Sequence, residues 1–271
     1  MNTYFNGLEP DFDVRQELQF TNGVMDLRQF DKIFISVSGG KDSHAMIFLV
    51  KELAEKQGCT DKLIAMYADT GMEWHNAESH VRKICQVANI PLEIAYPVRP
   101  MIDKFKFRIE QVKKNGKDLT KVAFPSAKCR YCTSEQKVAP MDNLIRKYKG
   151  KLLKVTGERW QESKARSTYT EFVKIDRVNS KHRTLYGWRP MLPYSTADIF
   201  DMIKDSGVER HVAYDMGCSR LGCAGCIFST DTDLRIEMRE HPIIFEALDK
   251  LEIDSGFTMS MTGVRIRDRI K

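Results

Sequence analysis

The stretch that decides the fold is Lys32-Ile33-Phe34-Ile35-Ser36-Val37 followed directly by Ser38-Gly39-Gly40-Lys41-Asp42-Ser43. The first six residues are short, apolar and β-rich, which predicts a buried strand. A helix is predicted from Asp42 or Ser43 to about Lys56, where Gly58 ends it. A glycine pair between a strand and a helix lets the backbone approach a ligand closely. The free amides and the helix dipole there favour an anion. We therefore predict a phosphate-binding loop; the alternative is a plain turn in which Asp42 caps the helix.

The residues around this loop predict an alternating arrangement of strands and helices. Such alternation indicates βαβ units and a parallel sheet. We predict further strands at 63–67, 91–96 and 152–156, with one more near 171–175 inside a charged loop, 163–181. We predict helices near 13–20 and at 76–88, 101–115, 132–148, 195–207 and 232–251, and loops at 116–128 and 217–227.

The predicted fold class is α/β: a parallel-sheet, Rossmann-like nucleotide-binding domain with a C-terminal helical, cysteine-bearing extension. The predicted divisions are an N-terminal lead-in at 1–30, the α/β domain at 31–200 and the extension at 201–271. No internal repeat is evident, which excludes solenoid and propeller folds.

Composition places the chain among ordinary globular proteins. Of its 271 residues, 42% are hydrophobic and 30% charged. The longest apolar run, Ala45–Val50, is far shorter than the roughly 20 residues of a membrane span. The first residues have neither a basic nor an apolar signal region. We therefore expect a cytoplasmic protein with no membrane partner.

The positive charge is concentrated in one part of the chain. Lysine and arginine number 43 against 37 acidic residues, a net charge of +6. Residues 99–151 carry 15 basic and five acidic residues. This excess favours an anionic partner, either nucleotide phosphates or nucleic acid. The alternative is a solvated helix face.

The loop resembles a known phosphate-binding motif. It lacks the spacing of a Walker A loop and of a dinucleotide fingerprint. Ser38-Gly39-Gly40-Lys41-Asp42-Ser43 instead resembles the S-G-G-x-D-S pyrophosphatase loop of the adenine-nucleotide α-hydrolase superfamily. The resemblance implies that ATP, with Mg²⁺, is cleaved between its α and β phosphates and that the loop holds the departing pyrophosphate.

A narrower resemblance covers residues 32 to 229. Tyr67-Ala68-Asp69-Thr70-Gly71 is similar to the D-T-G segment of the phosphoadenosine-phosphosulfate reductase family. Thr156-Gly157-Glu158-Arg159, with Glu162, Ser163 and Arg166, is similar to its G-x-R-x-x-E-S-x-x-R segment. Trp188-Arg189-Pro190-Met191-Leu192 and the following Ser195–Phe200 resemble its R-P segment.

The resemblance implies roles for individual residues. The expected ATP-binding residues are Ser36, Ser38, Gly39, Gly40, Lys41, Asp42, Ser43, Asp69, Gly157 and Arg159. The expected catalytic residues are Lys41, Asp42, Ser43, Arg159 and Arg166. Several alternatives stay open. Asp69 serves the ribose or only a turn, Asp42 meets a metal or caps the helix, and Arg166 binds phosphate or is a solvated loop charge. Glu162 orients an arginine or helps to bind Mg²⁺.

The family's reductases carry a nucleophilic cysteine in a C-terminal Glu-Cys-Gly motif, whereas no cysteine follows Cys226 here. We therefore favour an ATP pyrophosphatase that adenylates an acceptor for sulfur transfer, and the chain is most similar to those of DNA phosphorothioation. The expected partners are nucleic acid and a sulfur donor such as a cysteine desulfurase. The alternatives are a sulfonucleotide reductase and a non-catalytic module that senses nucleotide or binds nucleic acid.

Two C-x-x-C pairs, Cys129 with Cys132 and Cys223 with Cys226, indicate a metal site. Four thiolates suit either Zn²⁺ or a [4Fe–4S] cluster. The resemblance favours the cluster, with zinc as the alternative. Cys218 is an alternative ligand or a thiol that accepts sulfur. Arg130 and Arg220 are expected to lower the pKa of these thiols. The competing interpretation is buried, unliganded thiols or a redox dithiol.

Overall fold

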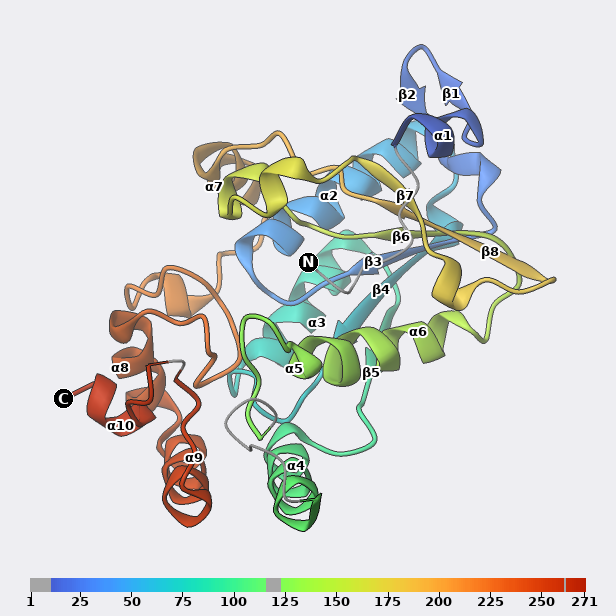
Figure 1. Ribbon diagram of the computed structural model, residues 1–271. Helices are drawn as coiled ribbons and strands as arrows, with labels where there is room; N and C mark the ends of the chain where they lie inside the picture. Colours follow the sequence, from blue (N-terminus) through green and yellow to red (C-terminus); the bar gives the residue numbers. More distant parts are fainter. Residues whose placement is uncertain (1–10, 116–122, 261) are drawn as a thin grey trace.

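The computed structural model describes residues 11–115, 123–260 and 262–271. A six-stranded sheet in the order β5-β4-β3-β6-β8-β7 forms its centre (Figure 1). All neighbouring strands are parallel except β7, which pairs antiparallel with β8. The predicted α/β class is therefore confirmed. The strands are β3 (Lys32–Ser36), β4 (Leu63–Ala68), β5 (Leu92–Ala95), β6 (Gly150–Val155), β7 (Phe172–Lys174) and β8 (Arg183–Trp188).

Helices cover both faces of this sheet because successive strand residues point to opposite sides. Ile33 and Ile35 of β3 face a core shared with three helices: α2 (Lys41–Gln57), α3 (Ala77–Ala88) and α7 (Thr196–Asp205). Phe34, between them, faces the other side, where α6 (Ala139–Ile145) packs. The phosphate loop lies between β3 and α2, at the carboxyl edge of the sheet.

One strand of the six-stranded sheet was not predicted. β8 reads Arg-Thr-Leu-Tyr-Gly-Trp, and its polar start and internal glycine hide the apolar pattern of a strand. It nevertheless lies between β6 and β7, with Gly150 opposite Arg183 and Val155 opposite Trp188. Gly187 fits because a Cβ there would lie 2.6 Å from Val173 Cγ2. The predicted strand near 171–175 is confirmed as β7, the edge strand.

Most predicted helices are confirmed with small shifts of their ends, but the helix predicted near 13–20 ends already at Gln16. The helix predicted at 132–148 consists of α5 (Tyr131–Thr133), a π turn (Ser134–Val138) and α6. Near the N-terminus, α1 (Asp11–Gln16) precedes an unpredicted hairpin of β1 (Phe20–Thr21) and β2 (Val24–Met25). The loop predicted at 116–128 lies partly outside the described residues. The remaining helices are α4 (Met101–Asn115), α8 (Asp231–Glu240), α9 (Pro242–Ser255) and α10 (Ile266–Arg269).

A second apolar cluster joins α4 to the C-terminal helices, which gather beside it in Figure 1. Phe105 of α4 packs in this cluster with Phe245 and Leu248 of α9. Ala213 and Cys218 belong instead to the main core. The division predicted at residue 200 stays a prediction. No helix in the described ranges is both long and apolar enough to cross a lipid bilayer.

Candidate functional site

The phosphate loop is held in shape by its own serines. Gly39 has a positive φ of 77°, a conformation that favours glycine. Ser43 Oγ donates to the Gly40 carbonyl at 3.0 Å and accepts from the Ser38 amide at 3.1 Å. Gly40 is the N-cap of α2, so the alternative in which Asp42 caps this helix is wrong.

Asp42 forms ion pairs with two cations. Its Oδ2 lies 3.1 Å from Lys41 Nζ and its Oδ1 lies 2.5 Å from Arg159 Nε. Arg159 is only 3% exposed. Gly157 makes this approach possible, because a Cβ there would lie 3.3 Å from the backbone of Asp42.

Glu162 connects the two predicted arginines. Its Oε2 accepts the backbone amide of Arg159 at 2.8 Å, and the same carboxylate pairs with Arg166. The sequence left two roles open for Glu162, orienting an arginine or binding Mg²⁺. Its contacts match the first role.

A cavity of about 560 Å³ opens over the loop. It brings together every predicted ATP-binding residue except Gly39 and Asp69. Gly39 lies in the loop itself, and Asp69 is in a turn in which its Oδ1 accepts the Gly71 amide at 2.9 Å. The predicted residues that line the cavity are Ser36, Ser38, Gly40, Lys41, Asp42, Ser43, Gly157, Arg159 and Arg166.

Several residues of the same cavity were not predicted. Tyr214 accepts the Lys41 backbone amide on its hydroxyl at 2.9 Å, and burial raises the pKa of Tyr214 to about 12. Arg220 and Lys137 also line the wall. No sequence pattern marks Tyr214 or Lys137, because the fold brings both to the loop from distant segments. Arg220 was noted only as a neighbour of the cysteines.

Three of the four paired cysteines lie at a second cavity of about 230 Å³, which Cys129 does not line. This cavity shares Ser38, Lys137, Arg220 and Leu221 with the first. Cys132, Cys223 and Cys226 line it. Within 11–115, 123–260 and 262–271, no three cysteine, histidine or acidic side chains are arranged to hold a metal ion. As placed, the thiols therefore do not fit the predicted zinc or [4Fe–4S] site.

Cys223 contacts charged side chains in this structure. Cys223 Sγ lies 3.3 Å from Glu73 Oε1, and Lys137 Nζ lies 3.0 Å from the same oxygen. Burial raises the pKa of Cys132 and of Cys223. Arg130 lowers the pKa of Cys132 as expected, but the effect of burial is larger. Cys218 is buried in the main core and does not line this cavity.

Five of the six histidines form a row behind the loop. His44 of α2 contacts His80 of α3, whose ring also contacts His211. Trp74 then joins His211 to His241, and His75 contacts His241. A Cβ on Gly39 would lie 3.4 Å from the His80 ring. The histidine row therefore packs against the loop at Gly39.

Of the basic residues in 99–151, Lys137 lines the loop cavity, and others lie elsewhere. Lys151 is the second residue of β6, at the amino edge of the sheet, where its Nζ donates to the Glu17 carbonyl at 3.0 Å. Within the segment, Glu135 pairs with Lys104 and Arg108. Part of the charge excess therefore serves internal ion pairs.

Comparison with known proteins identifies similar chains. The phosphoadenosine phosphosulfate reductase domain matches residues 32–229. An uncharacterised protein of Methanocaldococcus jannaschii is 25% identical over 78% of this chain and 45% of its own length. A probable sulfurtransferase of the same organism is 30% identical over 38% of this chain and 29% of its own length. This chain therefore spans less than half of either relative.

Among solved structures, the phosphoadenylyl-sulfate reductase of Candida auris covers 79% of this chain and 88% of its own, with 16% identity and a TM-score of 0.47.

Proposed function

Because the chain belongs to the phosphoadenosine phosphosulfate reductase domain family, we propose that it is an ATP pyrophosphatase that adenylates an acceptor for sulfur transfer. The observation that carries this proposal is the cluster at the carboxyl edge of the sheet. There the glycine loop, which includes Lys41 and has a φ of 77° at Gly39, lines one cavity together with the buried Arg159.

The chemistry that this cluster supports is attack on the α phosphorus of ATP. An acceptor oxygen forms a bond to that phosphorus while the bond to the α–β bridging oxygen breaks, and pyrophosphate leaves with the electron pair. Negative charge grows on the leaving group, so donors placed there beforehand stabilise the transition state. Ser38, the loop amides and Lys41 would hold the pyrophosphate.

Arg159 and Arg166 would neutralise the remaining phosphate charge, and the Glu162 contacts fix both arginines. Mg²⁺ would enter with ATP as part of the substrate. Both oxygens of Asp42 face cations in this arrangement, so Asp42 holds Lys41 and Arg159 in position.

Sulfur chemistry is the second part of the proposal. The cysteine cavity adjoins the loop cavity through Lys137 and Arg220, so a thiol lies next to the place where an adenylated acceptor would form. The name of the relative described as a probable sulfurtransferase agrees with this. We assign nucleic acid as the acceptor, of the kind modified in DNA phosphorothioation, and a cysteine desulfurase as the type of sulfur donor.

Product analysis tests the reaction. Incubation with ATP, Mg²⁺ and DNA or tRNA should yield AMP and pyrophosphate. Ser43→Ala should lower this rate at least tenfold, because it removes the hydroxyl that bonds Gly40 and Ser38. His182→Ala, at an exposed residue, is the matched control. Release of ADP and phosphate would contradict the proposal.

A sulfonucleotide reductase is the second candidate, favoured by the location of Cys223 beside the nucleotide cavity. A thiolate would attack the sulfate sulfur while the bond from that sulfur to the nucleotide phosphate oxygen breaks, which leaves an S-sulfocysteine. A second thiol would then attack this cysteine's sulfur, so that a disulfide forms and sulfite leaves with the electron pair. Thiol-dependent sulfite from either sulfonucleotide, lost in Cys223→Ser, would favour this candidate over the first.

A [4Fe–4S] cluster or Zn²⁺ on Cys129, Cys132, Cys223 and Cys226 stays a prediction of the sequence. It requires the thiols to move together, and Cys223 to leave Glu73. Anaerobic purification with metal analysis decides this point. Iron near four per chain indicates the cluster, equimolar zinc indicates the alternative, and neither metal would support the free thiols seen here.

A further inference from the structure

The turn between β5 and α4, residues 96–100, exposes two apolar side chains. Tyr96 is 63% exposed and Val98 is 94% exposed. The turn follows β5, so it lies at the carboxyl edge of the sheet, where the phosphate loop follows β3. One strand separates β5 from β3, which places their ends about 10 Å apart. The fold gains almost nothing from a valine so exposed, because an apolar side chain stabilises a protein by being buried.

This turn is held in one conformation. Pro97 and Pro100 each fix the backbone angle φ. Pro100 packs against Gly71, where a Cβ would lie 3.1 Å from the proline Cβ, and the Met101 amide donates to the Thr70 carbonyl at 2.8 Å. The turn is thereby anchored to the D-T-G segment at the end of β4. Side chains that are already held in place lose little conformational entropy when a ligand binds.

An arginine and a lysine contact one aromatic ring at the start of α4. The Arg99 guanidinium lies 4.5 Å from the centre of the Phe107 ring, and Lys104 Nζ lies 5.5 Å from the same centre. Arg99 is exposed, and no carboxylate of the described residues pairs with it. Bases that are not paired in a duplex stack on aromatic rings and on guanidinium planes. The start of α4 therefore offers two kinds of stacking surface.

The surroundings of this ring carry a net positive charge. Residues 99–114 contain six basic and two acidic residues. Glu135 pairs with Lys104 and Arg108 and adds a third carboxylate. Basic residues thus outnumber acidic ones by three when this carboxylate is included. Such an excess favours an anionic partner.

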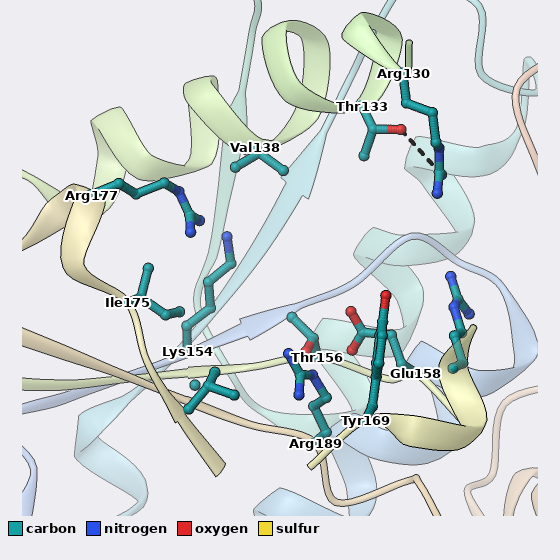
Figure 2. Close-up of a pocket in the computed structure, with 13 residues that line it drawn as sticks. Arg130, Thr133, Val138, Lys154, Thr156, Glu158, Tyr169, Ile175, Arg177 and Arg189 are labelled. Carbon is teal, nitrogen blue, oxygen red and sulfur yellow. Dashed lines mark hydrogen bonds between the residues drawn. The ribbon is translucent and has the colours of Figure 1, made fainter. Parts of the chain in front are cut away.

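Other basic residues have their partners inside the protein (Figure 2). Arg130 Nη2 donates to Thr133 Oγ1 at 3.3 Å, the contact drawn there as a dashed line. Lys154 is 5% exposed within β6, and its Nζ lies 3.5 Å from Asp142 Oδ1. Arg99, in contrast, faces solvent, so a partner can reach its charge.

The position of the turn narrows the kind of partner. Residues 96–100 do not line the loop cavity, so this surface serves something other than a nucleotide bound there. Met101 and Phe105, on the inner face of α4, line the cysteine cavity. A duplex hides the faces of its bases, whereas a single strand presents them together with its phosphates. A surface that combines stacking with positive charge therefore fits a single strand.

We propose that Tyr96, Val98, Arg99 and Phe107, which we call the stacking patch, bind unpaired bases of a single-stranded nucleic acid. The phosphates of the strand would pair with the basic residues of α4. The patch would hold the strand beside the cysteine cavity, which Met101 of the same helix lines. The role of this strand as the acceptor rests on the proposed function, whereas the binding itself does not.

Fluorescence anisotropy on the full chain tests the patch. The probes are labelled strands of thymidine or uridine, longer than the ~4–16 nucleotides that one such site covers, and a duplex of the same length. We expect a single strand to bind more tightly than the duplex. Tyr96→Ala combined with Val98→Ser should weaken single-strand binding about tenfold or more, the usual loss for one stacked base. Both side chains are exposed, so this double variant should fold.

Two further variants sharpen the test. Val24→Ser, at an exposed valine of the β1–β2 hairpin far from α4 (Figure 1), is the matched control and should bind as wild type. Arg99→Gln should weaken binding and make it less dependent on salt, because one cation is lost.

The proposal is overturned by a double variant that binds the single strand as tightly as wild type, or by a wild type that prefers the duplex. Failure to bind any of these probes would also overturn it and would point to a protein partner. AMP formation from ATP is measured in parallel. AMP without strand binding refutes the stacking patch and leaves the proposed reaction standing, whereas strand binding without AMP refutes the reaction and leaves the patch standing.

Discussion

Replacing Arg159 with methionine should lower kcat/KM for pyrophosphate release by about 10²–10³-fold, the usual loss when one preorganised charge donor is removed. Arg159 is buried, and its Nε lies 2.5 Å from Asp42 at the first turn of α2. Its guanidinium therefore presents fixed positive charge beside the loop. Methionine keeps much of the volume but removes that charge.

Two further variants separate catalysis from folding. Arg159→Lys keeps the charge but lacks the planar fork that contacts Asp42 and Tyr194 together. We expect it to recover activity only in part. The double variant Arg159→Met with Asp42→Asn removes both members of the pair, so it should fold well and stay inactive. Arg82→Met, at an exposed residue of α3, should match wild type. An Arg159→Met enzyme within threefold of wild type would refute this role.

Lowering the pH from 7.5 to 5.0 should reduce the free energy of unfolding by about 2 kcal/mol from each of two buried histidines. Burial lowers the pKa of His44 and of His211 to about 4. The unfolded chain, with values near 6.5, binds protons first as the pH falls. The stability that these groups contribute is therefore present above pH 6.5 and is lost between pH 6.5 and 4.

Burial is the main reason that the pKa of His211 is lowered, and the hydrogen bonds of its ring fit the neutral form. Its Nδ1 accepts the Ala213 amide at 3.1 Å, and its Nε2 lies 2.8 Å from Asn76 Oδ1. Protonation of Nδ1 would break the first contact. His75, His80 and His241 add positive charge nearby on protonation, whereas Asp215 opposes them.

Denaturant unfolding at the two pH values measures this loss. His211→Asn keeps an acceptor for the Ala213 amide and removes one titrating ring, so it should lose about 2 kcal/mol less than wild type. His182→Gln, at an exposed histidine outside the row, should behave as wild type. A wild-type free energy that does not change between pH 7.5 and 5.0 would exclude the row as the cause.

The part of the site that follows from the sequence is the part built from contiguous residues. The strand at 32–37 and the loop at 38–43 carry their own pattern, and the structure places them as predicted. Gly157 and Arg159 were identified because the segment that contains them resembles the G-x-R-x-x-E-S-x-x-R segment of the family. Motifs made of neighbouring residues were sufficient to identify these parts of the site.

The remainder depends on contacts between distant segments. Tyr214 reaches Lys41 across 173 residues of chain, and no local pattern marks such a contact. β8 is a strand because β6 and β7 flank it, although its first residues are polar. Lys154 could have been noticed as a lysine between Leu153 and Val155. The cysteine spacing predicted a metal site, but the thiols of the described residues are not arranged to form one.

The hydroxyl of Tyr214 has a consequence for how the loop is loaded. It occupies the backbone amide of Lys41, a donor that an incoming phosphate oxygen would need. Tyr214 belongs to the chain segment that continues to Arg220 and Cys223. This one hydrogen bond therefore connects the start of α2 to the segment that carries the second cysteine pair, 173 residues away in the chain.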